Sequence, residues 1–238
     1  MIQVRHLHKS FNGQQVLEDI NLQVKKGEIL VILGESGTGK SVLLKHLIGL
    51  LKPDQGSVLI EARDITKMSE RELLGLRKGI GYLFQEGALY DFMNVFENIA
   101  FPLREHTAFD GKIIREKVEN ILKLIGLEGT GEKYPAELSG GMKKRVALAR
   151  AIILDSRILL CDEPTSGLDP LRSRDISDLI RDAARKLHCT TVVTSHDISN
   201  SLRIADRLAL LQNGRIAAVG PPSEFKASNN VFVKEFIS

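Results

Sequence analysis

The N-terminal part of the chain carries apolar stretches of strand length. Ile2, Val4 and His6 alternate with polar neighbours, and a second stretch runs from Val16 to Val24. The unbroken apolar run Ile29–Leu33 follows a Lys-Gly turn. Alternation and short apolar runs bounded by turn residues predict three short strands over residues 2–33.

The remainder of the chain alternates between strand and helix patterns. Further strands are predicted at Gly56–Ile60, Ile80–Phe84, Ile158–Glu163, Thr190–Ser195, Arg207–Gln212 and Arg215–Val219, the last two joined by the hairpin signal Asn213-Gly214. Helices are predicted at Val42–Leu51, after a capping box that starts at Ser69, from Ser139, from Asp169, and in the tail Pro221–Ser238. For the helix after Asp169, one apolar stripe is formed by Ile176, Leu179, Ala183 and Leu187.

Residues 86–137 differ from the rest because helical patterns replace strands there. Ile114, Val118, Ile121 and Ile125 lie on one helical stripe. Residues 87–103 are rich in Leu, Phe, Tyr and Met, yet they are too irregular for one amphipathic helix. This stretch is either part of the core or a surface for a partner.

The composition is that of a soluble globular protein, with 43% hydrophobic and 26% charged residues among 238. The net charge of +3, without a long run of Lys or Arg, argues against a nucleic-acid partner. Cys161 and Cys189 form no metal-ligand pattern, which favours a reducing compartment. We expect no signal peptide, and no apolar stretch approaches the roughly 20 residues that span a bilayer. Work on a membrane would therefore require another chain.

The motif with the clearest chemistry is Gly34-Glu35-Ser36-Gly37-Thr38-Gly39-Lys40-Ser41. It reads G-x-x-x-x-G-K-S and stands between a predicted strand and a predicted helix, which is the context of a phosphate-binding P-loop. Glycines let the backbone curl round a polyphosphate with its N–H groups inward, and the helix N-terminus adds roughly half a positive charge. Lys40 is expected to reach the β- and γ-phosphates, and the Ser41 hydroxyl to ligate Mg²⁺. The motif therefore predicts nucleotide binding.

A second glycine-containing motif, Leu138-Ser139-Gly140-Gly141-Met142, is expected to open a helix with Ser139 as its N-cap. Each glycine just inside a helix costs about 1 kcal/mol relative to alanine. This cost indicates that another group approaches the backbone closely, and a helix N-terminus suits an anion. A plain helix cap is the alternative.

Acidic and imidazole side chains stand where predicted strands end. Asp162 can hold Mg²⁺ through water, and Glu163 can accept a proton from an attacking water. His196 follows another strand and is expected at the same sheet edge as the P-loop, which favours a functional over a merely structural role. Phe11, in the expected loop between the first two strands, either stacks on a base or packs within that loop. Asp169, before Pro170, is expected to cap a helix.

Together these motifs resemble those of the ATP-binding subunits of ABC transporters. The resemblance covers nearly the whole chain and rests, in the family's order, on Phe11, the P-loop, Gln85, residues 138–142, Asp162-Glu163, Ser166–Asp169 and His196. It implies an α/β P-loop NTPase fold of the ABC type, with a mixed or parallel central sheet, an N-terminal antiparallel β-subdomain and an inserted α-helical subdomain. Residues 1–238 would form one domain, divided into a RecA-like core with the β-subdomain (1–85 and 156–220), a helical subdomain (86–155) and a C-terminal helical tail (221–238).

The resemblance also implies ATP hydrolysis with Mg²⁺, and roles for individual residues. Glu163 would be the catalytic base, His196 would contact the γ-phosphate, and Gln85 would contact the attacking water. The implied Mg²⁺ ligands are Ser41, Gln85 and Asp162.

Further implied roles concern the nucleotide and a second copy of the chain. Phe11 would stack on adenine, and Asp169 would belong to the D-loop between subunits. Ser139, Gly140 and Gly141 would bind the γ-phosphate of ATP held by the second copy. The active form would therefore be an ATP-dependent, head-to-tail homodimer.

A narrower resemblance accounts for Met142, which stands where the family usually has Gln. Residues 83–89, 93–98 and 101–107 are similar to those of the MlaF-type ATPases of Mla/Mce phospholipid transport systems, where L-S-G-G-M is usual. This resemblance implies phospholipid transport through an integral membrane permease that contacts residues near 87–107. It also implies MCE-domain and STAS-domain subunits, and a peripheral position on the cytoplasmic face of the bacterial inner membrane.

Two other functions stay open. The chain could serve an ABC system for small polar solutes, from which only residues 87–107 separate the phospholipid hypothesis. It could also be a soluble ABC-type ATPase acting on nucleic acid or ribosomes. That class would usually carry a fused second ATPase or a long coiled-coil insertion, and the sequence shows neither.

Overall fold

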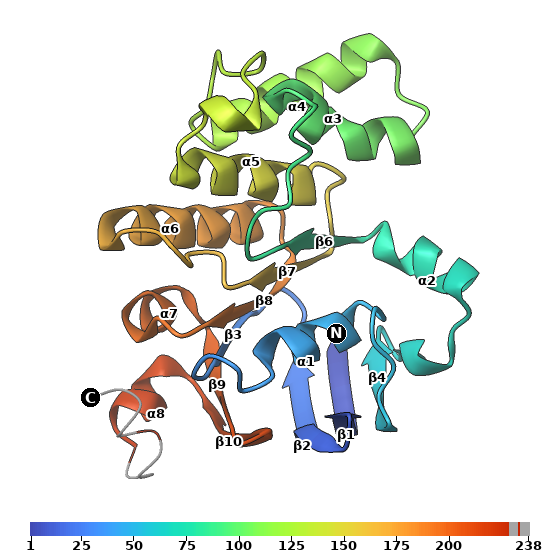
Figure 1. Cartoon of the computed structure of the whole chain (residues 1–238), viewed down its shortest axis with the longest axis vertical. Coiled ribbons are helices and arrows are strands. Elements are labelled where there is room, and N and C mark those ends of the chain that lie inside the picture. Colours follow the sequence, from blue (N-terminus) through green and yellow to red (C-terminus); the bar gives the residue numbers. More distant parts are fainter. Residues whose placement is uncertain (229–232, 234–238) are drawn as a thin grey trace.

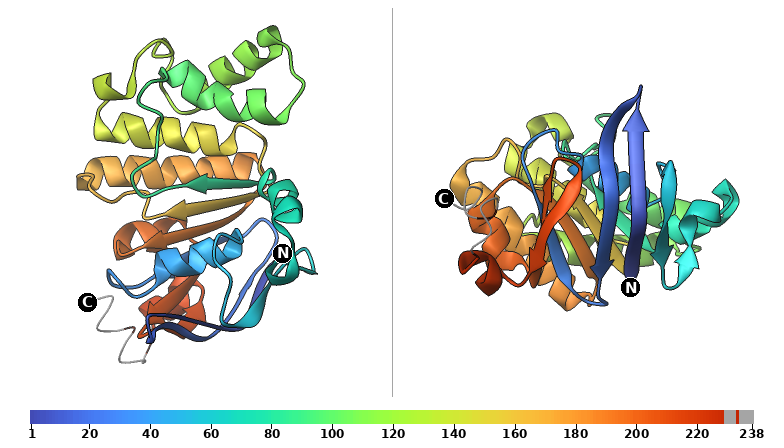
Figure 2. Two further views of the ribbon diagram at one scale, coloured as in Figure 1. Left: turned by 45° about the vertical axis from the view of Figure 1, so that its right-hand side comes forward. Right: turned by 90° about the horizontal axis from the view of Figure 1, so that it is seen from below.

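A mixed sheet, a smaller antiparallel sheet and a layer of helices make up the fold (Figure 1). The computed structural model describes residues 1–228 and 233. The antiparallel sheet has the strand order β2-β1-β4-β5 and comprises β1 (Ile2–Phe11), β2 (Gln14–Val24), β4 (Gln55–Ile60) and β5 (Arg63–Asp64). Seen from below, β1, β2 and β4 lie side by side beneath the rest of the molecule (Figure 2).

The mixed sheet has the strand order β10-β9-β3-β8-β7-β6. Its strands are β3 (Ile29–Leu33), β6 (Ile80–Leu83), β7 (Ile158–Asp162), β8 (Thr190–Ser195), β9 (Arg207–Gln212) and β10 (Arg215–Gly220). Neighbouring strands pair in parallel except β10, which returns antiparallel to β9 through the predicted hairpin turn. Asn213 and Gly214 have φ values of 48° and 72°, as a two-residue hairpin turn requires.

Helices flank the mixed sheet and form a separate layer above it. They are α1 (Lys40–Leu47), α2 (Glu70–Arg77), α3 (Val95–His106), α4 (Gly111–Leu124), α5 (Gly140–Ile152), α6 (Pro170–Lys186), α7 (Ile198–Ile204) and α8 (Pro222–Lys226), with short 3-10 turns at Ile65–Lys67 and Pro135–Glu137. The predicted N-caps Ser69, Ser139 and Asp169 are confirmed, and Ser69 forms the predicted capping box with Glu72. Across residues 1–228 and 233, every helix is too short or too polar to cross a bilayer.

Apolar clusters join these layers, and β7 shows how. Ile158 and Leu160 belong to a cluster with α1 and the antiparallel sheet, whereas Leu159 and Cys161 belong to a cluster with α5 and α6. Successive residues of β7 thus point to opposite faces of the sheet, and both faces are covered. A further cluster lies among α3, α4 and α5, the helices between β6 and β7. The predicted mixed sheet, antiparallel sheet and inserted helices are confirmed; the predicted residue boundaries of the subdomains stay a prediction.

The N-terminal strands are longer than the sequence predicts. Pairing of β1 with β2 continues to Phe11 and Gln14, across a turn in which Asn12 and Gly13 both have positive φ. Phe11 is therefore the last residue of β1. The prediction that Phe11 stands in a loop is wrong, because this turn needs only two residues.

Helix α1 is displaced from its predicted range, Val42–Leu51. It begins at Lys40, directly after Gly39 with φ 98°, and it ends at Leu47, shortly before Gly49 with φ 68°. Both glycines adopt left-handed backbone conformations that an α-helix excludes and that residues with a side chain rarely adopt. Backbone conformation, rather than hydrophobic pattern, sets both ends of this helix.

Within the irregular stretch 87–103, some side chains belong to the core and others are exposed. Val95, Ile99 and Leu103 are buried on α3 and belong to the core. Phe92, just before this helix, is 75% exposed. For the predicted C-terminal helices, α8 is present, and residues 229–232 and 234–238 lie outside the described part of the chain.

Two glycines allow a matched test of how closely α5 packs against β6. A Cβ built on Gly81 in β6 would lie 2.2 Å from the main-chain oxygen of Ala151 at the end of α5, whereas a Cβ on Gly75 in the exposed α2 would meet nothing within 4 Å. We expect Gly81→Ala to lower the free energy of unfolding by about 1–3 kcal/mol through overpacking. Gly75→Ala should raise it by about 0.5–1 kcal/mol, because alanine is the better helix former. Urea unfolding of both variants measures this; a harmless Gly81→Ala would contradict the close approach of α5 to β6.

Candidate functional site

The P-loop leads from β3 into α1 and lines a cavity of about 870 Å³. Several residues predicted for the site line this cavity, namely Glu35, Ser36, Gly37, Gly39, Lys40, Ser41, Gln85, Glu163 and His196. Of the other P-loop residues, Gly34 accepts a hydrogen bond from Lys40 and Thr38 closes the loop by donating to the carbonyl of Glu35. The sequence therefore predicts most of the wall of this cavity.

Strand order explains why these residues meet. β3 pairs in parallel with β8, and β8 pairs in parallel with β7. Parallel neighbours end at one edge of a sheet, where ligands of such folds bind. Leu33 is level with Ser195, and Asp162 is level with Thr194, so the segments that follow these strands share that edge.

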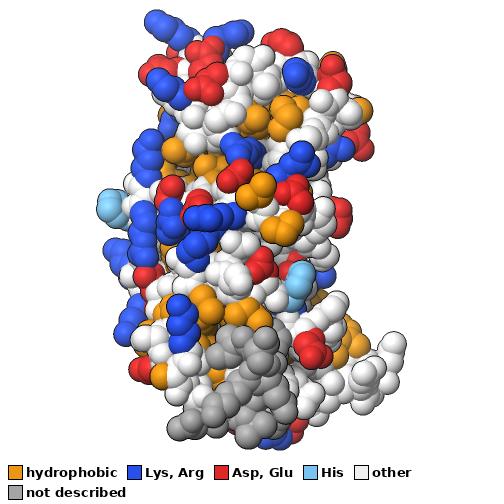
Figure 3. Space-filling model, turned by 90° about the vertical axis from the view of Figure 1, so that its left-hand side faces the viewer, with side chains coloured by type: hydrophobic (Ala, Val, Ile, Leu, Met, Phe, Trp, Pro, Cys, Tyr) orange, Lys and Arg blue, Asp and Glu red, His pale blue; other side chains and the backbone are white. Residues whose placement is uncertain are grey.

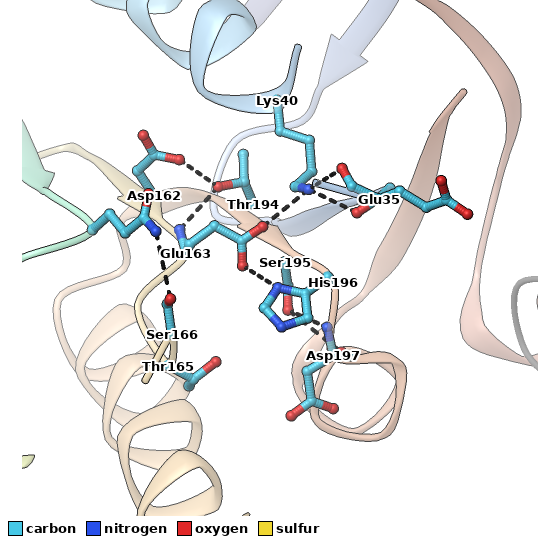
Figure 4. Close-up of polar contacts among 12 residues, drawn as sticks. Glu35, Lys40, Asp162, Glu163, Thr165, Ser166, Thr194, Ser195, His196 and Asp197 are labelled. Atoms are coloured by element: carbon cyan, nitrogen blue, oxygen red, sulfur yellow. Dashed lines mark hydrogen bonds and ion pairs between the residues drawn. The ribbon is translucent and has the colours of Figure 1, made fainter. Parts of the chain in front are cut away.

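The Lys40 side chain lies at the centre of the site and is only 5% exposed. Its Nζ donates to the main-chain oxygens of Gly34 and Glu35, at 2.7 and 2.8 Å, and lies 3.0 Å from Oε1 of Glu163 (Figure 4). An ammonium group has three hydrogens. All three therefore have an acceptor, and one of these acceptors is the carboxylate predicted to act as the base.

The other carboxylate oxygen of Glu163 contacts His196. Oε2 of Glu163 lies 2.9 Å from Nδ1 of His196, whose imidazole is otherwise largely exposed (Figure 4). Glu163 itself has φ 43°, a left-handed value that residues with a Cβ seldom adopt. Such strained positions concentrate at functional sites, where the surroundings hold them in place.

Asp162 is the last residue of β7, and hydroxyl groups donate hydrogen bonds to both of its carboxylate oxygens. Ser41 Oγ and Thr194 Oγ1 each donate to Oδ1 at 2.8 Å, and the Tyr82 hydroxyl donates to Oδ2 at 3.4 Å. Burial and the charge of Asp162 together raise the pKa of Tyr82, so this hydroxyl keeps its proton. Asp162 is thus oriented by donors from three different strands or helices.

The pair Ser41 and Asp162 offers oxygen ligands of the kind that Mg²⁺ prefers. Mg²⁺ sites usually use one or two carboxylates, several waters and the substrate phosphates, so they need no dense cluster of protein ligands. Indeed, within the described residues no three His, Cys, Asp or Glu side chains gather into a metal site. The residues present fit a Mg²⁺ ion that arrives with a nucleotide.

Gln85, two residues after the end of β6 at Leu83, also lines the cavity. Its Nε2 donates to Ser166 Oγ at 3.4 Å, and its main-chain oxygen accepts a hydrogen bond from Lys144 of α5. Burial lowers the pKa of Lys144. Nearby, Arg150 of α5 donates to the main-chain oxygen of Gly87 at 2.8 Å. Two cationic side chains of one helix thus hold the segment that carries Gln85.

Phe11 is not among the residues that line the cavity; Val16, on the paired strand β2, lines it instead. Phe11 is 41% exposed at the end of β1, and Lys9 Nζ lies 5.4 Å from its ring centroid. The predicted stacking of Phe11 on adenine stays a prediction.

Residues 139–141 lie outside this cavity, at the start of α5. Ser139 caps the helix by accepting a hydrogen bond from Met142 N at 3.3 Å, and it is exposed together with Gly140. A Cβ built on Gly140 or Gly141 would meet its nearest neighbour at 3.6 or 3.7 Å, an ordinary contact. No contact within the described chain therefore requires glycine at these two positions. Asp169 likewise lies away from the cavity and caps α6.

Several residues around the site are missed by sequence reasoning. Thr194, Tyr82 and Lys144 act through contacts with Asp162, Glu163 or Gln85 and belong to no recognisable motif. Thr194 is the last residue but one of β8 and stands level with Asp162, the last residue of β7, but this placement depends on strand register rather than on a local pattern. Ile198 and Gln212, which also line the cavity, belong to no motif either.

Comparison with known proteins identifies the family. Residues 17–166 match the family described as ABC transporter. Over its full length the chain is 44% identical to the probable ribonucleotide transport ATP-binding protein mkl of Mycobacterium leprae, of which it spans 68%. It is 41% identical to the intermembrane phospholipid transport system ATP-binding protein MlaF of Haemophilus influenzae, of which it spans 90%. It is also 40% identical to the methionine import ATP-binding protein MetN of Carboxydothermus hydrogenoformans, of which it spans 72%.

Solved structures agree with the sequence relatives. The dimeric post-hydrolysis ATP-binding cassette MJ0796, bound to ADP and Pi, superposes with a TM-score of 0.85 at 31% identity, over 93% of this chain and 99% of that one. Protein cbiO1 of Clostridium perfringens, part of the ABC transporter complex cbiONQ, gives 0.88 at 32% identity, over 99% of this chain and 94% of that one. The chain therefore belongs to the ABC transporter family, as an ATP-binding subunit that hydrolyses ATP.

Proposed function

We propose that this ATPase drives phospholipid transport through a membrane permease, and that it works as a head-to-tail homodimer on the cytoplasmic face of a bacterial inner membrane. The observation that carries the catalytic part is the cluster of Lys40, Glu163 and His196 above the Ser41–Asp162 pair. The similarity to MlaF, which spans nearly all of both chains, supports the phospholipid part. MCE-domain and STAS-domain subunits belong to the same proposal and rest on that similarity alone.

In the proposed mechanism, Lys40 and the P-loop backbone bind the β- and γ-phosphates. All three hydrogens of the Lys40 ammonium have acceptors, so a phosphate oxygen would replace one of these acceptors. The carboxylate of Glu163 is the one replaced in this proposal, because it is a side chain that can rotate, whereas the other two acceptors are main-chain oxygens of the P-loop. Glu163 is then free to accept a proton from the attacking water. Gln85 orients this water, and His196 contacts the γ-phosphate. Mg²⁺, held by Ser41, Asp162 and Gln85, would neutralise the charge that develops on the phosphates.

Positive charge on the side that carries the P-loop supports the same proposal. The loop before α1 lies on the left-hand side in Figure 1, and Figure 3 looks onto that side. Lys and Arg side chains gather in the left half of the middle of this face, with some Asp and Glu side chains beside them (Figure 3). A local excess of positive charge attracts anions such as nucleotides and raises their local concentration.

The two glycines at the start of α5 support the head-to-tail arrangement. Gly140 and Gly141 are costly at a helix start, yet no neighbour among residues 1–228 and 233 requires either of them. A second copy whose ATP approaches this backbone would explain them, with Ser139 and the helix N-terminus binding the γ-phosphate. Asp169 would lie beside the same interface. Phe11, at the end of β1, would stack on the adenine.

Residues near 87–107 are the proposed contact with the permease. Phe92 is the most exposed aromatic residue of this segment, and its ring lies 5.7 Å from that of Tyr90. The turn that displays it is rigid, because the fully buried Asn98 donates to the main-chain oxygens of Tyr90 and Met93, at 3.0 Å each. A fixed turn with an exposed aromatic side chain is typical of a protein contact.

A second candidate function is import of small polar solutes. It is favoured by the 40% identity to MetN, which is nearly as high as the identity to MlaF. Both candidates share the same ATPase chemistry and differ in what the permease carries.

Replacing the proposed base tests the chemistry. Glu163→Gln keeps the size of the side chain and removes the proton acceptor, so we expect the rate of ATP hydrolysis to fall by about 10²–10⁴-fold. ATP binding should persist, whereas Lys40→Ala should abolish it. Steady-state phosphate release and calorimetry measure the two effects. An unchanged hydrolysis rate in Glu163→Gln would remove Glu163 from this role.

A variant of the exposed turn tests coupling and cargo together. In proteoliposomes that hold this chain with its permease, Phe92→Glu should abolish ATP-driven transfer of a fluorescent phospholipid, because it places a charge in an apolar contact. Its affinity for ATP should stay within about twofold, since Phe92 lies outside the cavity. Leu74→Glu, at a 60% exposed position of α2, is the control and should retain transfer. Unimpaired transfer by Phe92→Glu would refute the contact, and uptake of methionine instead of lipid transfer by the wild type would favour the second candidate.

A further inference from the structure

Thr194 contacts the carboxylate of Asp162 and the main chain of Glu163. It is the last residue but one of β8, it is fully buried, and it stands level with Asp162 on β7. Its Oγ1 accepts a hydrogen bond from the main-chain N–H of Glu163 at 3.0 Å and donates to Oδ1 of Asp162 at 2.8 Å (Figure 4). One hydroxyl thus contacts both consecutive acidic residues.

The direction of these two bonds is fixed by what a hydroxyl can do. A threonine has a single O–H donor and two acceptor lone pairs. The N–H of Glu163 can only donate, so the hydroxyl hydrogen remains for one acceptor. The main-chain oxygen of Cys161 is the other acceptor within reach, but at 3.5 Å it is more distant than Asp162 Oδ1. The hydrogen therefore goes to the carboxylate.

Packing alone does not explain a threonine at this position. Of the other buried residues of β8, Val192 and Val193 are valines, whereas Thr190 and Thr191 are threonines whose hydroxyls contact Gly27 N and Cys189 Sγ rather than an acidic residue. Valine has nearly the same shape as threonine and suits a buried strand better, because it has no hydroxyl to satisfy. The feature that valine could not supply is the bridge between Asp162 and Glu163.

The hydroxyl of Thr194 contacts Asp162 and Glu163, and the orientation of both acids matters for the proposed chemistry. Glu163 has φ 43°, and its backbone is held on one side by Thr194 and on the other by Ser166, whose N–H donates to Glu163 O at 3.1 Å. This backbone conformation directs the side chain toward Lys40 and His196 (Figure 4). At Asp162, Thr194 donates to the same carboxylate oxygen as Ser41, so this oxygen would keep one donor if Ser41 turned to a Mg²⁺ ion.

We propose that Thr194 is a positioning residue for ATP hydrolysis, whose hydroxyl sets the orientation of Asp162 and Glu163 at once. The inference rests on the roles proposed above for these two acids. Thr194 does not line the cavity, so it would act through Asp162 and Glu163.

Isosteric variants test this inference. Thr194→Val removes only the hydroxyl, and we expect kcat to fall by about 10- to 100-fold, the effect of losing one hydrogen bond to a charged group. The KM for ATP should stay within about threefold, because the P-loop is untouched. The Mg²⁺ concentration that half-saturates binding of a fluorescent ATP analogue should rise, since Asp162 loses a donor that orients it. Thr194→Ser keeps the hydroxyl and should restore both kcat and the Mg²⁺ dependence.

The control is Thr191→Val, also fully buried on β8, where the hydroxyl contacts only Cys189 Sγ at 3.7 Å among the described residues. It should retain the wild-type kcat. A wild-type kcat and Mg²⁺ dependence in Thr194→Val would overturn the inference, as would equal losses in Thr194→Ser or in Thr191→Val. Glu163→Gln, assayed in parallel, distinguishes a failure of the role of Thr194 from a failure of the catalytic role proposed for Glu163. If that variant is inactive while Thr194→Val is fully active, only the role of Thr194 fails; if Glu163→Gln is fully active, the proposed catalytic role fails.

Discussion

The common edge at which β3, β8 and β7 end is the constraint on which the site depends. These three strands are neighbours in one sheet and run in parallel, although β3 is far from β7 and β8 along the chain. Each is buried along its whole length, so none can shift in register without exposing apolar side chains. The P-loop, Glu163 and His196 follow these strands directly, and Asp162 is the last residue of β7. Their proximity is therefore set by the core rather than by contacts among the polar groups themselves.

At that edge the Lys40–Glu163 ion pair would link the proposed phosphate binding to the proposed catalysis. The same ammonium that is proposed to hold the phosphates neutralises the carboxylate that is proposed to act as the base. Both groups are nearly buried, so the interaction is weakly screened and neither charge is easily left without a partner. A γ-phosphate that takes over Lys40 would release Glu163 where an acceptor for a proton is needed. In the structure the proposed base is thus paired with Lys40, the group that is proposed to bind the phosphates.

The sequence predicts those parts of the site that one segment determines alone. The P-loop, the acidic pair at the end of β7 and the helix caps at Ser139 and Asp169 depend on local spacing, and the structure places them as expected. Residues that act across strands were missed, because the bond of Thr194 to Asp162 depends on strand order and register, which no local pattern encodes. The ends of α1 and the place of Phe11 were wrong for a related reason: backbone conformation at Gly39, Gly49 and the Asn12-Gly13 turn decided them.

The proposed head-to-tail pair, in which each active centre takes Ser139 to Gly141 from a second copy, is tested most directly by mixing two inactive variants. Lys40→Ala spoils a P-loop, whereas Gly140→Asp places a negative charge at an exposed helix start, where it favours the fold but repels a phosphate. A mixed dimer retains one intact centre, built from the P-loop of one variant and the helix start of the other. Equal mixing should therefore restore about a quarter of the wild-type hydrolysis rate, since random pairing makes half of the dimers mixed. A mixture as inactive as its components, or a Gly140→Asp variant that is fully active alone, would contradict the shared site.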